Sequence, residues 1–314
     1  MPSWNELVSA LEAQKSDSEK NKWLFGKLIG SLQQVGKLRG GRNVLFYASA
    51  FLQKPQAHPM FLQITQEEIN GFMSSMHGMD WSKGLTLIMH TPGGITNSTE
   101  TIVAYLRSKF PNDIEVIVPT YAMSAGTMIS LCADRIIMGR QSQLGPIDPQ
   151  MPVGGRTVSA VAILDQFERA KKEISANRNM AHLWAPILPS LGPALLQEAQ
   201  NAIDYSEKVV AGWLMRYMFN GQADAEAKGN TVASYFSRGS DKKSHGRRID
   251  REEAREQGVV IEDLESSQDL QEAVLTAYHL MTILFEKSPA VKAIISERSK
   301  MWIKNIAVQP PVAR

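Results

Sequence analysis

Residues 85–138 read LTLIMHTPGGITNSTETIVAYLRSKFPNDIEVIVPTYAMSAGTMISLCADRIIM, and this stretch decides the fold. Short apolar segments alternate in it with helical patterns, at 85–89, 97–109, 114–118, 124–133 and 135–138. Such alternation is typical of parallel βαβ units, in which right-handed crossovers bring the carboxyl ends of the strands to one edge. The stretch therefore predicts an α/β fold whose functional site lies at that edge.

Capping boxes mark the starts of helices before this stretch. Ser3 and Glu6 have the spacing of a capping box and open a helix with an apolar stripe. Thr65 and Glu68 have the same spacing and predict a second helix start. On that second helix we expect a set of apolar side chains to face the core: Ile69, Phe72, Met73 and Met76.

The regions on either side of the α/β stretch complete the predicted organisation. Residues 43–51 (NVLFYASAF) predict one more buried strand, and residues 268–286 predict a last long helix. We therefore divide the chain into an N-terminal helical region, an α/β core, and a C-terminal helix with a tail, at residues 1–42, 43–265 and 266–314.

The composition is that of an ordinary globular protein. Hydrophobic residues make up 43% and charged residues 21% of the 314 residues, which excludes a mostly disordered chain. The net charge of +2 argues against a dedicated nucleic-acid-binding protein, which usually carries a marked basic excess. The single cysteine, Cys132, allows no intrachain disulfide, excludes a cysteine-rich zinc site and favours a reducing compartment.

The sequence also lacks targeting and cofactor motifs. No basic segment followed by an apolar run opens the chain, and no apolar run reaches the length of about 18 residues needed for a membrane span. We therefore expect a cytoplasmic protein that does not enter a membrane. The histidines show no paired metal-ligand spacing, and Walker A and GxGxxG motifs are missing. We accordingly expect no metal and no cofactor.

Two loops that follow predicted strands carry the candidate chemistry, residues 90–94 (HTPGG) and 121–127 (YAMSAGT). Ser124 lies among small residues at a helix start, where unpaired N–H groups and the positive dipole end are found. A serine there can attack a carbonyl while nearby N–H groups, one of them from Gly93-Gly94, stabilise the oxyanion. The alternative is that Ser124 only caps a helix and the glycines only form a turn.

Long motifs around these loops resemble the serine dehydrogenase proteinase family. They are GRNVLFYASAFL (41–52), LIMHTPGG (87–94), VPTYAMSAGTMISLCADRIIMGRQSQLGPIDPQ (118–150) and SHGRRIDREEAREQGVVIEDLE (244–265). This family is the soluble branch of the Clp-protease/crotonase superfamily and is related to signal peptide peptidase A. The resemblance covers roughly residues 1–285. It implies a crotonase-like spiral of ββα units with added terminal helices.

The resemblance also implies a function and a set of site residues. It points to a serine peptidase that acts on protein or peptide substrates, with Ser124 as the nucleophile. The N–H groups of Gly94 and Ala125 would form the oxyanion hole, and the substrate cleft would be lined by Gly93, Met123 and Pro146. A homo-oligomer is implied too, with the first helix and the 268–286 helix as candidate contacts.

The sequence indicates the general base less clearly than it indicates the nucleophile. Clp-type proteases place a histidine soon after the serine, but the corresponding region here is GPIDP (145–149), without a histidine. Relatives of signal peptide peptidase use a lysine further along, and Lys171 is the matching candidate. Lys171 shares a helical face with Leu164, Phe167 and Ile174, which would point it toward a core and favour the neutral amine. The alternative is that Lys171 reaches solvent.

His245 is the second candidate base. Paired with Asp148, it would give a triad in which the last two members are exchanged relative to Clp proteases. Histidine needs little adjustment for this role because it titrates near neutral pH. The alternative is a surface histidine in a basic loop. We prefer His245 to Lys171, since Asp148 then also has a role, and keep both.

Three functions follow from these readings. The favoured one is an ATP-independent, cofactor-free serine peptidase. The second is an acyl-CoA-binding crotonase-type enzyme, in which the same paired N–H groups stabilise an enolate and no serine is required. The third is a catalytically silent oligomeric scaffold that binds peptides. His90 is expected to be a structural histidine, with a place in the cleft as its alternative.

Overall fold

The computed structural model describes residues 3–187, 194–238 and 245–306, and the chain forms two compact units. Unit 1 comprises residues 1–144 and 248–314, and unit 2 comprises residues 145–247. These boundaries differ from the division at 43 and 266 drawn from the sequence, which stays a prediction.

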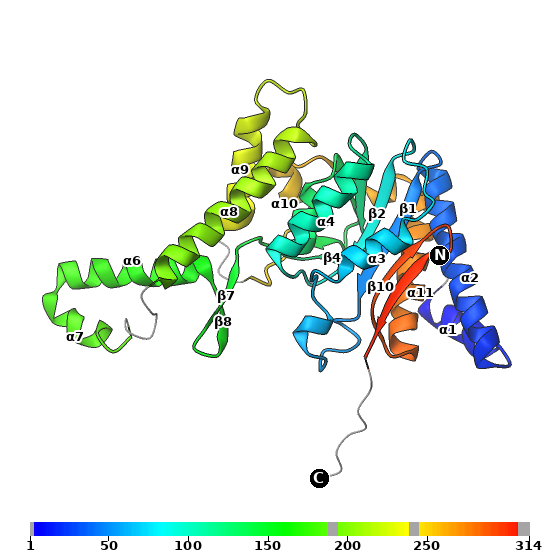
Figure 1. The fold of residues 1–314 in the computed structure, drawn as a ribbon, viewed down its shortest axis with the longest axis horizontal. Helices are drawn as coiled ribbons and strands as arrows, with labels where there is room; N and C mark the ends of the chain where they lie inside the picture. The colour runs from blue at the N-terminus through cyan, green and yellow to red at the C-terminus, as the bar shows by residue number, and fades with distance from the viewer. Residues whose placement is uncertain (1–2, 188–193, 239–244, 307–314) are drawn as a thin grey trace, which may run out of the picture. The chain divides into compact units, whose positions relative to one another are not determined.

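Seven strands form the central sheet of unit 1, in the order β11-β10-β1-β2-β3-β5-β9 (Figure 1). Their bounds are β1 Asn43–Ser49, β2 Leu85–His90, β3 Ile114–Val118, β5 Arg135–Met138, β9 Ile261–Asp263, β10 Ala290–Ser296 and β11 Met301–Asn305. The strands from β1 to β9 pair in parallel, whereas β10 is antiparallel to both of its neighbours. The predicted α/β class is confirmed, and the spiral of ββα units stays a prediction.

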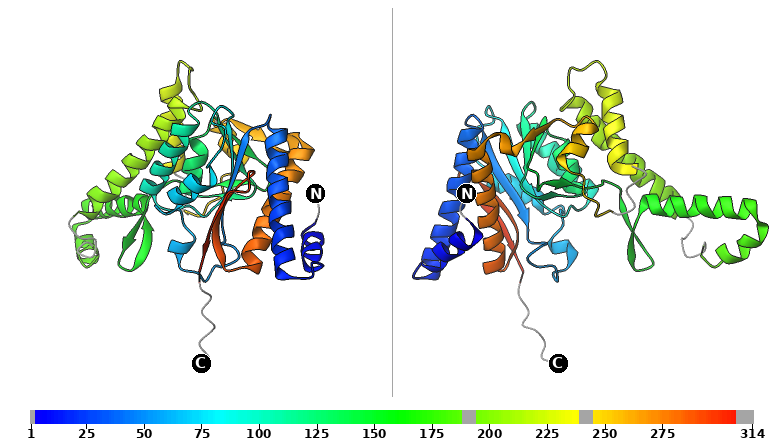
Figure 2. Two further views of the ribbon diagram at one scale, coloured as in Figure 1. Left: turned by 45° about the vertical axis from the view of Figure 1, so that its right-hand side comes forward. Right: turned by 180° about the vertical axis from the view of Figure 1, so that it is seen from behind.

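Helices cover both faces of this sheet. On one face α2 (Asp17–Leu38) and α11 (Gln268–Lys287) lie side by side, with α1 (Trp4–Glu12) packed against both (Figure 2). The other face is covered by α3 (Glu68–Ser75), α4 (Thr96–Lys109) and α5 (Ala125–Leu131). Alternate residues of β1 point to opposite faces, so that Phe46 joins the core with α2 and α11 while Tyr47 packs on Phe72 of α3.

Short elements connect the layers of unit 1. They are η1 (Pro59–Phe61), β4 (Tyr121–Ala122), β6 (Gln143–Leu144), α10 (Arg251–Glu256) and η4 (Leu264–Ser266). β4 and β6 pair in parallel as a two-stranded sheet. In the part of the chain that the structure describes, no helix combines the length and the apolar character that a membrane crossing needs.

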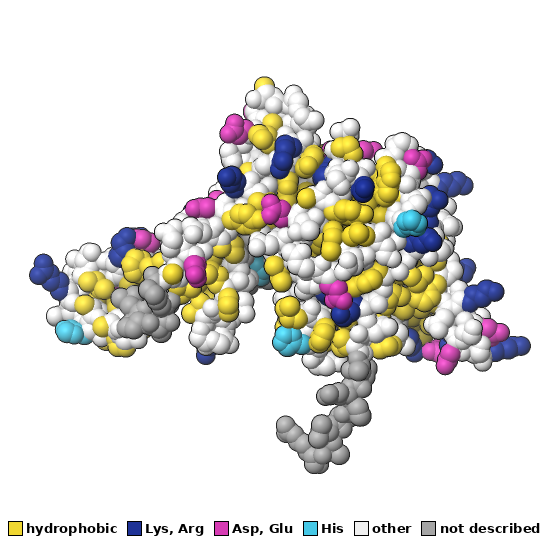
Figure 3. Space-filling model, in the orientation of Figure 1, with side chains coloured by type: hydrophobic (Ala, Val, Ile, Leu, Met, Phe, Trp, Pro, Cys, Tyr) yellow, Lys and Arg dark blue, Asp and Glu magenta, His cyan; other side chains and the backbone are white. Residues whose placement is uncertain are grey.

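Two expectations about unit 1 need correction. Residues 266–314 were expected to hold a helix and a tail, but residues 290–305 form the strands β10 and β11. Met73 was expected to face the core, yet it is 52% exposed, because α3 turns Gly71, Phe72 and Ser75 inward instead. Hydrophobic side chains consequently gather on the surface over α3 and β11, on the face drawn in Figure 3.

Unit 2 is mainly helical. Its elements are β7 (Gln150–Val153), β8 (Arg156–Ser159), α6 (Ala160–Ala176), η2 (Arg178–Met180), α7 (Ala181–Trp184), α8 (Leu195–Arg216) and α9 (Ala225–Arg238). The hairpin of β7 and β8 turns at Gly154 and Gly155, both with positive φ. A small apolar core joins α6 to α8 through Ala160, Ile163, Leu195, Ala199 and Ile203.

Candidate active site

The loops that follow β2 and β3 meet at Thr91. The Thr91 N–H donates to the carbonyl oxygen of Tyr121 at 3.0 Å, and its own carbonyl oxygen accepts from the Met123 N–H at 3.1 Å. The Thr91 hydroxyl oxygen also accepts from the Gly93 N–H at 3.2 Å. One residue thus ties together the two loops that the sequence singled out, at the carboxyl edge of the sheet.

Ser124 lies at a sharp turn between β4 and α5. Its backbone angles are φ 50° and ψ −115°, a conformation that costs a non-glycine residue about 1–3 kcal/mol. A strained serine between a strand and a helix is the geometry of a nucleophile elbow, which presents the hydroxyl at the top of a sheet. Ser124 is half-buried and occupies the N-cap position, yet its side chain forms no capping hydrogen bond. A helix-capping hydrogen bond of its side chain therefore does not explain the conformation of Ser124.

Glycines allow the neighbouring backbone to lie against this turn. A Cβ atom on Gly93, whose φ is 107°, would lie 2.6 Å from the Cβ of Ser124 and 2.7 Å from the Met123 carbonyl oxygen. A Cβ atom on Gly126 would lie 2.5 Å from the Cγ2 of Thr91. Contacts this short oppose a side chain at both positions, so the turn is held by the Met123 backbone at Gly93 and by the Thr91 side chain at Gly126.

The candidate oxyanion-hole residues present free backbone donors. Among the described residues, neither the Gly94 nor the Ala125 N–H donates a hydrogen bond. The Cβ position of Gly93 lies 3.1 Å from the Ala125 nitrogen, so the two loops adjoin at these amides. Paired backbone N–H groups beside a serine are the donors that stabilise a tetrahedral oxyanion.

Ile64 fixes the glycine loop from its other side, and the sequence analysis missed it. The Ile64 N–H donates to the Gly93 carbonyl oxygen at 2.8 Å, and the Ile64 carbonyl oxygen accepts from the Ile95 N–H at 2.9 Å. These bonds join backbone groups about thirty residues apart, so no side-chain motif in the sequence announces them. Thr91 lies in the loop 90–94 that the sequence singled out, but its bonds to Tyr121 and Met123 were missed because they too join backbone groups.

In unit 2 the structure brings Asp148 and His245 together. The Nδ1 atom of His245 lies 2.7 Å from Oδ1 of Asp148, and Oδ2 of Asp148 accepts from the Gln150 side-chain amide at 2.8 Å. A carboxylate at Nδ1 orients the ring and leaves Nε2 to act as a base. Pro146, two residues before Asp148, is buried. The catalytic roles assigned to Asp148 and His245 remain predictions.

Lys171 does not face a core. Its side chain is 57% exposed, its Nζ pairs with Glu168 at 2.7 Å, and the same atom lies 6.0 Å from the centre of the Phe167 ring. The helix α6 buries Ala160, Ile163 and Ala170 instead, so the apolar stripe assumed from the sequence was misphased. The prediction that burial activates Lys171 is therefore wrong, and the solvent-exposed alternative describes it.

His90 is a structural histidine, as expected. It is 2% exposed, its Nδ1 lies 2.9 Å from the Thr120 hydroxyl, and the rings of Phe51 and Tyr278 pack on it. Burial lowers the pKa of His90 to about 3, so the ring is neutral at ordinary pH. It is the last residue of β2 and immediately precedes Thr91.

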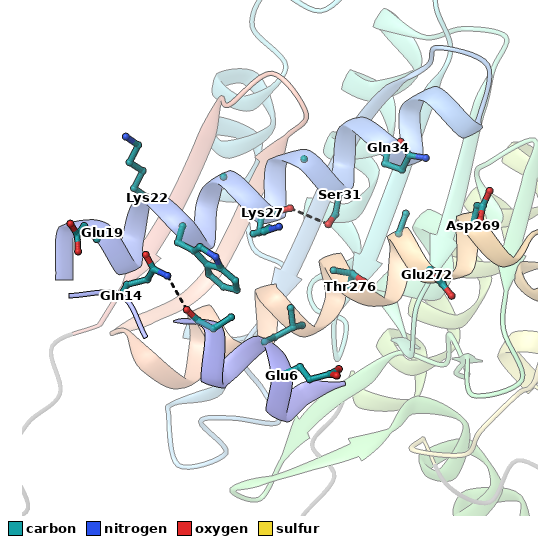
Figure 4. Close-up of a pocket in the computed structure, with 16 residues that line it drawn as sticks. Glu6, Gln14, Glu19, Lys22, Lys27, Ser31, Gln34, Asp269, Glu272 and Thr276 are labelled. Carbon is teal, nitrogen blue, oxygen red and sulfur yellow. Dashed lines mark hydrogen bonds between the residues drawn. The ribbon is translucent and has the colours of Figure 1, made fainter. Parts of the chain in front are cut away.

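A groove of about 1300 Å³ lies elsewhere in unit 1, between α1, α2 and α11 (Figure 4). Apolar and small residues form part of its lining, and charged side chains stand around it: Glu19, Lys22 and Lys27 from α2, Glu6 from α1, and Asp269 and Glu272 from α11. None of the candidate catalytic residues lines it. Across the described ranges, no group of three or more histidine, cysteine, aspartate or glutamate side chains is placed to hold a metal ion.

Comparisons with known proteins give matches that include the loops 90–94 and 121–127. Residues 54–182 match the sequence model of the ClpP-like SDH-type serine proteinases. Two uncharacterized proteins of Methanocaldococcus jannaschii are also similar. MJ0137 is 41% identical over 93 residues, covering 30% of this chain and 32% of that protein. MJ1495 is 33% identical over 154 residues, covering 48% of this chain and 49% of that protein.

The matches therefore span a third to a half of the length of these relatives. Among solved structures, the 1510-N membrane-bound stomatin-specific protease aligns with a TM-score of 0.38 and 18% identity, over 64% of this chain and 75% of that one. The matched segment 54–182 contains both loops, Ser124 and Asp148, but not His245. The resemblance read from the motifs is thus confirmed: across residues 54–182 this chain matches the ClpP-like SDH-type serine proteinase family.

Proposed function

We propose that this protein is a serine peptidase that hydrolyses peptide bonds through an acyl-enzyme on Ser124. The observation that carries the proposal is the backbone of Ser124, which is strained, locked by Gly93 and Gly126, and free of a capping role. Strain of this kind persists where the surrounding structure enforces it, and it concentrates at functional sites. The family match over residues 54–182 supports serine peptidase chemistry in general.

In the proposed mechanism the Ser124 hydroxyl attacks the carbonyl carbon of the substrate while a base accepts its proton. The carbonyl oxygen becomes an oxyanion that accepts hydrogen bonds from the N–H groups of Gly94 and Ala125. The intermediate collapses, the C–N bond breaks, and the base returns the proton to the leaving amine. Water then attacks the serine ester by the same route and regenerates the free hydroxyl.

We propose His245 as the base, oriented by Asp148. The support is the 2.7 Å hydrogen bond between them, which fixes the ring, and the 30% exposure of the histidine side chain, which leaves it accessible. Lys171 is the weaker candidate because it lacks the desolvation that the role requires. Gly93, Met123 and Pro146 are retained as proposed cleft residues for a protein or peptide substrate.

A fluorophosphonate probe and casein cleavage test the nucleophile. The probe is expected to label the wild-type protein, and Ser124→Ala should abolish both labelling and cleavage. Ser108→Ala, which removes an exposed hydroxyl on α4, serves as the matched control and should leave both intact. Undiminished labelling of the Ser124→Ala variant would overturn the proposal. Peptide binding without turnover in the wild type would favour the silent scaffold instead.

We further propose that the peptidase is a homo-oligomer that works without ATP in the cytoplasm. The surface of α1 and α11, which borders the groove in Figure 4, is the proposed contact. Its charged margin carries Lys22 and Lys27 together with Glu19 on α2, and acidic residues on α1 and α11, so two copies can match opposite charges. Sedimentation of wild-type protein and of Ala10→Glu, a partly exposed residue that lines the groove, tests this, and a monomeric wild type would exclude it.

A further inference from the structure

A buried ion pair lies in unit 1, formed by Lys292 of β10 and Glu68 at the start of α3. The exposed fractions of the two side chains are 1% and 0%. Burying two charges carries a desolvation penalty, and a well-packed apolar pair at such a place is often as stable or more stable. Stability alone therefore does not explain this pair, and its surroundings indicate another role.

Glu68 links the ion pair to the segment that precedes α3. One carboxylate oxygen faces Lys292, and the other accepts from the Thr65 N–H at 2.7 Å and from the Thr65 hydroxyl at 2.8 Å. Hydrogen bonds to a charged acceptor are stronger than those between neutral groups. Thr65 is thereby held in place, and so is Ile64 immediately before it.

Ile64 in turn sets the glycine loop. Its backbone bonds to Gly93 and Ile95 flank Gly94, and a Cβ atom on Gly94 would lie 2.2 Å from the Ile64 carbonyl oxygen. The backbones are therefore in direct contact. The position of Ile64 determines the orientation of the peptide between Gly93 and Gly94, and with it the direction of the Gly94 N–H.

The same segment is held at its other end by the sheet. Ser49 of β1 donates to the carbonyl oxygen of Leu62 at 2.7 Å, and Ser49 is the residue opposite Lys292 in the pairing of β1 with β10. Residues 62–68 are thus attached to the sheet at both ends. Leu62 and Ile64 also bury their side chains, at 6% and 0% exposure, so the two polar attachments orient a segment that packing already holds against the core.

We propose that Lys292 and Glu68 are positioning residues of the active site, an inference that rests on the proposed peptidase function. Their ion pair holds residues 62–68 so that the Gly94 N–H points to the oxyanion. Lys292 lies outside the segment matched by the family, so the site draws on a residue that the match does not include. A donor that acts on the oxyanion affects the transition state, and its misplacement lowers kcat more than it changes KM.

The test replaces the ion pair by an apolar pair, because a single substitution leaves one buried charge unpaired and endangers folding. Lys292→Met with Glu68→Met is expected to fold with a Tm near that of the wild type. Its kcat should fall about 10- to 100-fold, somewhat less than the loss of a whole oxyanion donor, with KM nearly unchanged. Lys292→Met with Glu68→Gln should recover only part of kcat, since the amide oxygen again accepts from Thr65 but no Lys292 fixes it in place.

The matched control is the neighbouring ion pair of Lys304 with Glu67, which attaches the same segment to β11 near the surface. Lys304→Met with Glu67→Met should lower kcat much less, because both side chains are partly exposed and such pairs contribute little. Wild-type kcat in the Lys292/Glu68 apolar variant, or an equal loss in the control, overturns the positioning role.

Amide hydrogen exchange separates this inference from the proposed function. Exchange of the Ile64 and Ile95 N–H groups should speed up in the Lys292/Glu68 apolar variant, because the loop is released. Unchanged exchange overturns the inference whether or not the wild type is active. Wild-type protein without turnover that depends on Ser124 overturns the peptidase function instead, while faster exchange in the variant still supports the holding of the loop.

Discussion

The surroundings of Ser124 in unit 1 are fixed by backbone contacts, whereas Asp148 and His245 in unit 2 are joined by one side-chain hydrogen bond. Around Ser124, Gly93 lies against Ser124 and the Met123 backbone, and Gly126 lies against the Thr91 side chain, so that added side chains would clash. His245 is 30% exposed, and of its two ring nitrogens Nδ1 meets the carboxylate. The region around Ser124 is therefore defined by the shape of its backbone. The pair of Asp148 and His245, here called the dyad, is defined by the chemistry of its two side chains. Substitutions should therefore act through steric exclusion in the first and through loss of a functional group in the second.

The largest effect is expected for Gly93→Ala. The new Cβ would lie 2.6 Å from the Cβ of Ser124, and the φ of 107° is unfavourable for alanine, so the elbow has to move. Activity should fall by at least about 10²-fold, as for the loss of an oxyanion donor. Gly154→Ala is the control, since it also has positive φ but open space around its Cβ position. Near-wild-type activity of Gly93→Ala would show that the turn is not locked by shape.

A large effect is also expected in unit 2, but without a steric cause. His245→Ala should lower kcat by about 10²-fold or more, the usual contribution of a general base. Asp148→Asn keeps the shape of the pair and should lower kcat by a similar or larger factor, because the ring loses its orienting carboxylate. Steady-state kinetics with circular dichroism as a folding control measures this. Full activity of both variants would remove the dyad from the mechanism.

A smaller effect is expected in the pH dependence of stability, through His90 at the end of β2. The pKa of His90 is lowered by burial from 6.5 to about 3, so the folded state binds fewer protons than the unfolded state within that range. Its stabilising contribution is complete above 6.5 and is lost as the pH falls toward 3. The free energy of unfolding should drop by about 1 kcal/mol over the first pH unit below 6.5.

Urea titrations at several pH values measure this dependence, with His90→Phe for comparison. The variant keeps an aromatic ring among Phe51 and Tyr278 but has no titrating group, so its slope with pH should be shallower. Parallel slopes for the variant and the wild type would contradict the assignment. Comparing slopes rather than absolute stabilities removes the effect of any packing change.

The smallest effect is expected for Lys171→Gln. The lysine side chain is 57% exposed and its partner Glu168 is 55% exposed, and exposed ion pairs contribute little. Activity and Tm should stay near the wild-type values, as for the neighbouring Lys172→Gln. A selective loss of kcat in Lys171→Gln, with His245→Ala still active, would reverse the order of the two candidate bases.

Local sequence patterns were sufficient to predict much of the fold and the part of the site around Ser124. The apolar runs of β2, β3 and β5 stand between clear turn signals, and the loops after them contain the glycines that the turn requires. Asp148 and His245 were paired on the basis of the resemblance, and the structure places them in contact across 97 residues. The strand β10 was missed because Lys292, a charge at a buried position, interrupts its apolar run.

The remaining errors have two physical origins. The face of α6 that holds Leu164 and Lys171 was misphased because unit 2 has a small core, and a half-buried helix gives a weak periodic signal. The contact of Ile64 with Gly94 was missed because it joins backbone atoms. Backbone pairing between distant segments leaves no side-chain pattern in the sequence that could announce it.

The packing of Gly93 has a consequence for how this protein can change over generations. Every single-nucleotide change of a glycine codon that alters the residue adds a side chain or ends the chain, and here any side chain strikes Ser124 or Met123. The glycine serves the architecture as well as the chemistry. A descendant that exchanged Ser124 for alanine would keep the Cβ atom at this position, so a side chain at position 93 would still strike it.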